Sequence, residues 1–158
     1  MTLPVSGVDP PLRLLAAFHQ IHPDLLSTHI IQAPGRDMWA AAAVRPTDAF
    51  TVHIFDLGVH TSFSRRTAKL RRTLLNRPLP RWARYPAGVV LALNDAGLDA
   101  NGIAAVIVGE ESPGPRYDYA LGMTFAALIH VVCGQSFTAD SLLEIVEKAR
   151  RDYVEEER

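Results

Sequence analysis

Apolar residues along this chain recur at helix-like and strand-like spacings, with short turns between them. A first helix is predicted before His22-Pro23, because four apolar residues there share one helix face. Asp9, which is followed by two prolines, is a suitable N-cap for this helix, and Pro23 prevents the helix from continuing. The four apolar residues are Leu14, Leu15, Phe18 and Ile21.

Three β-strands are predicted to follow this helix. Residues 27–32 and 38–44 are separated by the turn 33–36 (Ala-Pro-Gly-Arg), and residues 50–56 alternate between two faces, as in a sheet strand. Four consecutive alanines make 38–44 an unusual strand, but the turn at 45–48 favours a hairpin with the strand after it. We therefore expect strand 50–56 to pair with strand 38–44.

The predicted fold is organised around an apolar strand at 103–108. A turn-rich loop at 109–118 follows it, and then an apolar helix at 119–132. A helix start that follows a strand and a glycine-bearing turn directs free backbone N–H groups and a positive dipole end at one point. If the chain binds an anion, this is the place where we expect it.

Two further helices are predicted. Residues 82–96 form one, with Gly97 as its stop. The other begins near Thr138, or at Ser141 with Glu144 completing a capping box. Each helix carries one apolar stripe: Tyr85, Val89, Leu93 and Ala96 in the first, and Leu142, Val146, Ala149 and Tyr153 in the second.

Length and charge exclude several classes of protein. A chain of 158 residues with 48% hydrophobic residues is sufficient for one globular domain with its own core. The net charge of −1 argues against nucleic acid as a general partner. No run reaches the ~18 apolar residues of a membrane-spanning helix, and the N-terminus lacks a targeting signal. We expect a cytoplasmic protein that binds no membrane and no nucleic acid.

The charge is nevertheless unevenly placed. Eight of the sixteen basic residues lie between positions 65 and 84. Within this segment, 65–72 is either a short helix or a solvated connection. Aromatic residues of the kind that stack on bases are not interleaved with it. Nucleic-acid binding through 65–84 is a further alternative, which a steep salt dependence would support.

The order of these elements resembles the N-terminal half of galactokinase, a sugar kinase of the GHMP family. The turn at 33–36 matches the Ala-Pro-Gly-Arg that begins the family's sugar-binding signature. Residues 82–89 resemble its Trp-x-x-Tyr-x-x-Gly-Val helix, and 102–113 resemble the strand that leads into its ATP loop. The resemblance implies a mixed β-sheet covered on one side by helices. Three more segments lie in corresponding order: 14–23, 44–55 and 150–154.

Two functional signatures of the family are missing or altered in this chain. After Arg36 the family continues with Asn-Leu-Ile-Gly-Glu-His-Thr-Asp-Tyr, which holds the sugar hydroxyls, whereas this chain continues with Asp-Met-Trp-Ala. The family's ATP loop, Pro-x-Gly-x-Gly-Leu-Ser-Ser-Ser, corresponds to Pro-Gly-Pro-Arg-Tyr-Asp-Tyr at 113–119. One glycine is left in this loop, and the serines are gone.

The altered loop is expected to bind phosphate poorly. Pro113 and Pro115 supply no N–H donor, and Asp118 is expected to cap the helix and to repel a triphosphate. The alternative is that Arg116 supplies a compensating cation. The residues of this degenerate loop that are candidates for cofactor binding are Ser112, Gly114 and Arg116.

Arg36 is the candidate catalytic residue, because the resemblance implies that this arginine lies near the reacting groups. The alternative is a structural ion pair with Asp37, Glu110 or Asp118. Glu110 and its neighbour Glu111 are expected to point to opposite sides of an extended segment, so paired acid–base chemistry is not expected of them.

No metal site is predicted. His19 and His22 lie three residues apart, but they straddle a helix end and have no third ligand nearby in the sequence. His53 in a strand and His130 in an apolar helix are interpreted as structural residues with satisfied hydrogen bonds.

These features predict a single α+β domain over residues 1–158, without the C-terminal lobe of the family. We expect a galactokinase-like protein that is inactive on its own, requires no cofactor and acts as a binding domain. The missing lobe is expected to expose apolar surface, which a second copy in a homodimer or another protein partner covers. The alternative is half of an active sugar kinase that uses ATP and Mg²⁺ and is completed by another chain.

Overall fold

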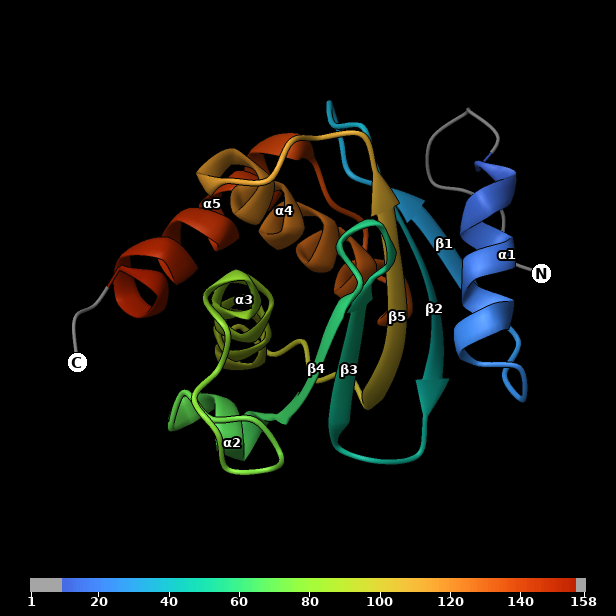
Figure 1. The fold of residues 1–158 in the computed structure, drawn as a ribbon. Coiled ribbons are helices and arrows are strands. Elements are labelled where there is room, and N and C mark those ends of the chain that lie inside the picture. The colour runs from blue at the N-terminus through green and yellow to red at the C-terminus, as the bar shows by residue number, and fades with distance from the viewer. Residues whose placement is uncertain (1–9, 156–158) are drawn as a thin grey trace.

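The computed structural model describes residues 10–155, which form a five-stranded mixed sheet with helices on both faces (Figure 1). The strand order is β1-β2-β5-β3-β4; β3 and β5 are parallel, and the other neighbours are antiparallel. The α+β class and the mixed sheet are thereby confirmed, but the expectation that helices cover one side only is wrong, because α1 packs on the opposite face. The strands are β1 (His29–Gln32), β2 (Met38–Arg45), β3 (Ala49–Ile54), β4 (Val59–Ser64) and β5 (Gly102–Gly109). The helices are α1 (Leu12–Ile21), α2 (Arg65–Lys69), α3 (Arg84–Asp95), α4 (Pro115–Val132) and α5 (Ala139–Ala149).

Two apolar clusters hold the helices to the sheet. The larger one packs α3, α4 and α5 against one face, and the smaller one packs α1 against the other (Figure 1). The predicted apolar face of α1 is present, and the helix ends before His22. The expected N-cap, Asp9, lies outside the described residues.

Among residues 10–155, no helix is both long enough and apolar enough to cross a membrane.

β5 occupies the centre of the sheet because its side chains are apolar on both faces. Every residue from 103 to 108 is buried. Ala41 of β2 lies opposite Val106 on one side, and Val52 of β3 lies beside Ala105 on the other. The predicted pairing of strand 50–56 with strand 38–44 is therefore wrong. A short connection favoured a hairpin, but the fully apolar strand takes the position between the two.

The alanines of β2 have a packing role, and the predicted strand is confirmed. Ala40 and Ala42 belong to the larger cluster, whereas Ala41 and Ala43 belong to the smaller one on the α1 side. Both α4 and α1 contact β2. Small side chains on both faces allow a helix to approach from either side, and this explains why a strand with low β propensity is kept here.

A strand that the hydrophobic pattern did not indicate, β4, lies directly before the basic segment. β4 alternates buried Thr61 and Phe63 with more exposed His60 and Ser62. Both residues on the exposed face are polar, and one of these two buried residues, Thr61, is polar as well. The alternation of apolar and polar residues that predicts a strand is therefore weak. Of the two predicted alternatives for 65–72, the short helix is correct, because α2 begins there.

The last helix begins at the first of the two predicted positions. Thr138 is the N-cap of α5; its side chain accepts a hydrogen bond from the Ser141 N–H at 3.0 Å. The Thr138 N–H donates in return to the Ser141 hydroxyl at 2.9 Å. The alternative start at Ser141 with Glu144 is therefore wrong. The predicted stripe is buried against the core: Leu142, Val146, Ala149 and Tyr153.

Candidate functional site

The candidate site is the loop that joins β5 to α4. α4 begins at Pro115, four residues before the predicted start, with Gly114 as its N-cap at a φ of 140°. Proline is favoured at the first helical position because its φ is already fixed, and Gly114 tolerates the positive φ. The apolar pattern used for the prediction starts only at Tyr119 and does not register this polar first turn.

Asp118 does not cap α4, which corrects the sequence prediction. Its backbone N–H already donates to the Gly114 carbonyl at 3.0 Å, so Asp118 lies inside the first turn. No side chain caps the helix at Gly114. Pro115 has no N–H, so the backbone of Arg116 and Tyr117 supplies the remaining donors before Asp118.

Negative charge surrounds these donors. Burial raises the pKa of the Asp118 carboxyl, and the nearby Arg81 partly opposes this. Tyr117 is buried beneath the loop. Burial, followed by the charges of Asp56, Asp118 and Glu111, raises its pKa to about 12. Burial is the main cause of this shift, and the three carboxylates add to it, so their charges disfavour a further anion at this position.

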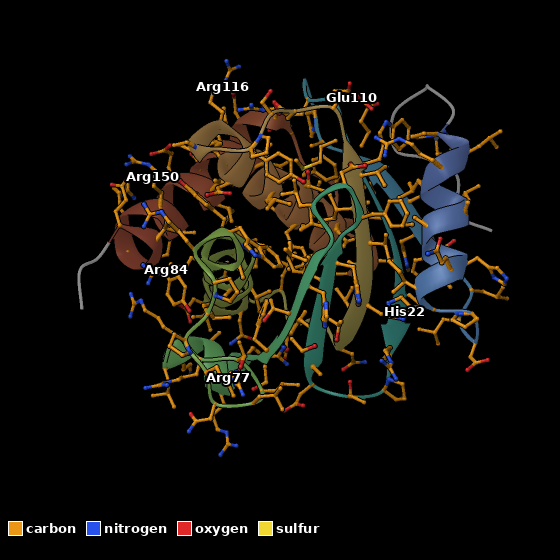
Figure 2. All side chains as sticks on the ribbon, viewed as in Figure 1. His22, Arg77, Arg84, Glu110, Arg116 and Arg150 are labelled. Atoms are coloured by element: carbon orange, nitrogen blue, oxygen red, sulfur yellow. The ribbon has the colours of Figure 1, made fainter. Side chains whose placement is uncertain are left out.

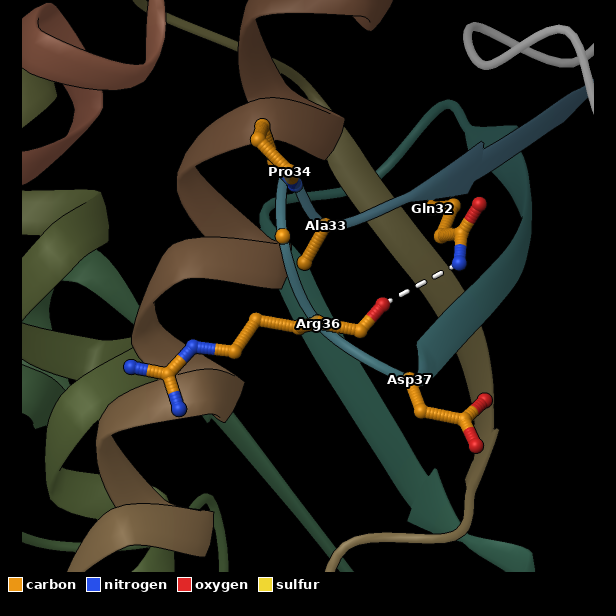
Figure 3. A pocket seen from close by; sticks show the side chains of 6 residues that line it. Gln32, Ala33, Pro34, Arg36 and Asp37 are labelled. Carbon is orange, nitrogen blue, oxygen red and sulfur yellow. Dashed lines mark hydrogen bonds between the residues drawn. The ribbon is translucent and has the colours of Figure 1, made fainter.

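Arg36 turns its side chain toward α4, away from Asp37 (Figure 3). Its guanidinium lies 3.5 Å from the Glu111 carboxylate and 6.0 Å from the centre of the Tyr119 ring. An ion pair was the predicted structural role, but the partner differs from the three predicted ones. The backbone of Arg36 also accepts a hydrogen bond from the Gln32 side chain at 3.1 Å. No feature of the structure tests a catalytic role for Arg36.

A small hollow lies at the turn that carries Arg36. It has a volume of about 300 Å³ and is lined by residues 32–37 (Figure 3). A second hollow of about 310 Å³ adjoins the start of α4, where Arg81 faces the carboxylates of Asp118 and Glu155. Each hollow is lined by apolar, polar and acidic residues together with one arginine. Neither of them is a cluster of cations suited to a triphosphate.

A second ion-pair group beside the loop was not predicted. Arg13 of α1 contacts Asp56 and also Glu110, the latter at 2.9 Å. Asp56 in turn accepts a hydrogen bond from the Gly109 N–H at 2.8 Å. The three residues come from distant parts of the sequence, so no local pattern could have indicated the group. Glu110 and Glu111 thus bind different arginines, which confirms that they point to different sides.

The predicted cofactor-binding residues lie on this loop, and their role stays a prediction. Ser112 is exposed, Gly114 is the N-cap of α4, and Arg116 is exposed at the second position of the helix. Across residues 10–155, no group of three or more His, Cys, Asp or Glu side chains has the geometry of a metal site.

Three histidines gather on the sheet face that α1 leaves uncovered. The rings of His53 and His60 are stacked with centroids 4.7 Å apart, and the His22 ring meets His53 edge-on at 5.4 Å. Burial, followed by the charges of His60 and His22, lowers the pKa of His53 to about 4. Its Nδ1 is buried without a hydrogen-bond partner among the described residues, so the interpretation of His53 as satisfied is wrong. For His130 it is confirmed, because Nδ1 lies 2.8 Å from the Ala126 carbonyl oxygen.

Comparison with known proteins identifies the fold. No protein-family model and no curated protein sequence matches this chain. Among solved structures, the galactokinase of Lactococcus lactis in complex with galactose is similar, with a TM-score of 0.62 and 15% identity over 78% of this chain and 32% of that one.

Two mevalonate kinases are similar as well. One has a TM-score of 0.56 and 8% identity, over 73% of this chain and 37% of the other. The enzyme from Methanococcus jannaschii has a TM-score of 0.54 and 9% identity, over 72% and 36%. This chain thus spans about a third of the length of the structures that it matches. At these identities the likeness concerns the fold alone, and the chain has a GHMP-kinase-like α+β fold.

Proposed function

We propose that this chain is a kinase-fold domain that does not transfer phosphate on its own and that acts by binding another protein or a second copy of itself. One observation carries the proposal: the chemistry of the first turn of α4. Pro115 removes an N–H donor, and Asp118 adds negative charge inside the first turn, where Glu111, although paired with Arg36, also acts on Tyr117. Phosphoryl transfer depends almost entirely on positioning and electrostatic stabilisation, and this turn favours neither.

The binding role is supported by exposed leucines. Leu70, Leu74 and Leu75 lie within six residues of one another and are all exposed. Leu74 and Leu75 line one groove, and large exposed apolar patches usually mark an interaction site. This part of the proposal therefore concerns a surface and does not depend on the nucleotide loop.

The alternative, half of an active sugar kinase, is favoured by Arg116. Its side chain is exposed at the start of α4, and no carboxylate among the described residues forms an ion pair with it. An arginine at a helix N-terminus is well suited to phosphate. ATP and Mg²⁺ would then be the cofactors.

Calorimetric titration with Mg-ATP, with and without galactose, separates the two proposals. We expect no saturable heat at millimolar ATP, together with a mass in solution above that of one chain or complex formation with a partner. Saturable ATP binding that is lost in Arg116→Ala would overturn the proposal and favour the split kinase.

A charge-neutral variant tests the electrostatic argument directly. Replacing Glu111 and Asp118 by Gln and Asn should raise the affinity for inorganic triphosphate several-fold, because two repelling charges are removed. Asp140→Asn is a matched control, since Asp140 also lies in the first turn of a helix, α5. If the double variant and the control bind triphosphate equally, repulsion by these carboxylates is not the reason for weak binding.

A further inference from the structure

A groove lies between the edge strand β4 and the turn that precedes α3. Its volume is about 460 Å³, and no carboxylate lines it. β4 contributes His60 and Ser62, and the opposite wall comes from residues 73–80. The Leu74 N–H donates to the Ser62 carbonyl at 2.9 Å, so the turn is fixed directly to the free edge of the sheet.

The turn over 72–78 presents its leucines from an ordered backbone. The Thr73 N–H donates to the Arg77 carbonyl at 2.7 Å, and the Thr73 hydroxyl accepts from the N–H groups of Leu75 and Arg77, both at 3.2 Å. The Arg72 guanidinium donates to the Asn76 carbonyl at 3.1 Å. Leu75 is nevertheless 80% exposed. Because the backbone is already ordered, a partner that covers these leucines loses little conformational entropy there.

The groove itself has no carboxylate in its lining, and Arg65 of the adjacent α2 forms an ion pair with Asp99. No Asp or Glu occurs between Asp56 and Asp95, a stretch that contains eight Lys and Arg residues. Arg77 lines the groove, and Arg66 and Lys69 are exposed on the adjacent α2. None of these three cations forms an ion pair with a residue in the described range. Unpaired cations around an apolar groove are complementary to an acidic partner with an apolar side chain.

The groove is separate from the α4 loop. Figure 2 shows Arg77 at one end of the molecule, and Glu110 and Arg116 at the opposite end. Ligand binding at the two places can therefore be measured independently with variants of different residues.

We infer that the groove between β4 and the 72–78 turn docks a short acidic segment of another protein, which inserts a large apolar side chain between the two walls. This inference rests on the proposed interaction role and names its surface and the chemistry of its partner. The leucines of the turn contact the inserted side chain, and Arg77 with the cations of α2 binds the flanking carboxylates.

Three fluorescein-labelled synthetic peptides test the chemistry by fluorescence anisotropy. The first carries a Leu-Phe pair between runs of Glu and Asp; the second replaces the pair by Ser-Ser; the third keeps the pair and replaces every acid by Lys. We expect the first to bind best. The second should bind at least about tenfold more weakly, because the buried apolar side chains are lost. The third should not bind, because like charges meet.

Substitutions inside and outside the groove test whether the peptide binds there. Leu75→Glu and Arg77→Glu should each weaken binding of the first peptide by about fivefold or more. Leu26→Glu is the control for Leu75, because Leu26 is 85% exposed and lies outside the groove. Arg45→Glu is the control for Arg77. Backbone amide shifts in NMR spectra should move at His60, Ser62 and Leu74 when the first peptide is added.

Other results would overturn the inference. Equal binding of the first two peptides, or loss of binding in the control variants as much as in the groove variants, would exclude an apolar docking groove here. Tighter binding of a poly-uridine RNA than of the acidic peptide would assign the basic surface to nucleic acid instead. Failure of all three peptides, with ATP still unbound, would overturn this docking site and leave the proposed interaction role standing. Saturable ATP binding would overturn the proposed inactivity of the α4 loop, and the peptide results alone would then decide the docking site.

Discussion

The two ends of this molecule differ in how their charged side chains are paired. At the end that carries the loop after β5, which we call the loop end, Arg13 binds Asp56 and Glu110, and Arg36 binds Glu111. At the other end, the turn end formed by α2 and residues 72–78, the exposed cations have no carboxylate partner among residues 10–155. At the loop end Arg13 and Arg36 are held in ion pairs and Arg116 is the exposed exception. At the turn end Arg65 pairs with Asp99, whereas the exposed cations Arg66, Lys69 and Arg77 stay available to another molecule.

The sequence indicates only part of this contrast, because its strand-loop-helix pattern favours an anion site at the loop end while Asp118 in the same loop opposes one. A strand, a glycine-bearing loop and an apolar helix indicate an anion site at the loop end, and a run of basic residues by itself indicates only a solvated surface. In the structure, carboxylates from distant segments reach the loop end, and an ordered apolar groove accompanies the cations at the turn end. Tertiary neighbours, and not the local motif, decide which end is suited to bind an anionic partner.

The largest expected effect concerns β5, which connects the two ends. A Cβ added to Gly109 at the loop end would lie 2.5 Å from the Asp37 carbonyl oxygen, and one added to Gly102 would lie 2.5 Å from that of Ala49. Gly109→Ala and Gly102→Ala should each lower the free energy of unfolding by about 2–3 kcal/mol in urea titrations, because backbone must move. Ser112→Ala, in the exposed loop, is the control and should change it by less than about 0.5 kcal/mol. If only one of the two variants loses stability, the backbone next to the other glycine can shift to accommodate the added Cβ.

The next largest effect is expected from removing a paired arginine, compared with removing an unpaired one. Arg13→Ala should lower the free energy of unfolding by about 1 kcal/mol, because two carboxylates lose their cation, whereas Arg77→Ala should change it by less than about 0.5 kcal/mol. Urea denaturation at low salt and at 1 M NaCl measures both, and salt should reduce only the effect at Arg13. Equal losses in the two variants would contradict the contrast between a paired and an unpaired end.

A smaller effect is expected from pH, through the histidines beside the groove. Because the pKa of His53 is lowered to about 4, the folded state binds fewer protons than the unfolded state between that value and the ordinary value near 6.5. Stability from this residue is fully present above about pH 6.5 and falls as the pH decreases toward 4. Solvent screens this half-buried ring, so the loss should stay below about 1 kcal/mol.

The variant His53→Phe isolates this contribution, because phenylalanine keeps an aromatic ring next to His60 and does not titrate. Urea midpoints measured from pH 7.5 to 4.5 should fall less steeply for the variant than for the natural chain. Parallel curves would show that the buried histidine does not contribute to the acid sensitivity.

The smallest effect should come from the tip of the turn. Leu75→Ser should change the free energy of unfolding by less than about 0.5 kcal/mol, because the side chain is 80% exposed. Thermal and urea unfolding check this. A large loss would mean that Leu75 supports the fold, and its exposure would then carry no information about a partner.

Local sequence determined most of the elements and their ends. Pro23 after α1, Gly97 after α3 and the Thr138 capping box of α5 fixed boundaries that depend on the backbone chemistry of a few adjacent residues. The α+β class followed from the same patterns. β4 was not predicted because four of its six residues are polar, and the start of α4 was missed because its first turn is not apolar.

The tertiary structure alone decided the rest. The insertion of β5 between β2 and β3, the pairing of Arg36 with Glu111 and the convergence of His22 on His53 join segments that lie far apart in the chain. A sequence pattern records which face of a segment is apolar but not which other segment covers it, because that choice depends on packing over the whole molecule. For this reason the sequence located the loop of the candidate site and its own carboxylates Glu111 and Asp118, and only the fold showed that Asp56 joins them and that Arg36 pairs with Glu111.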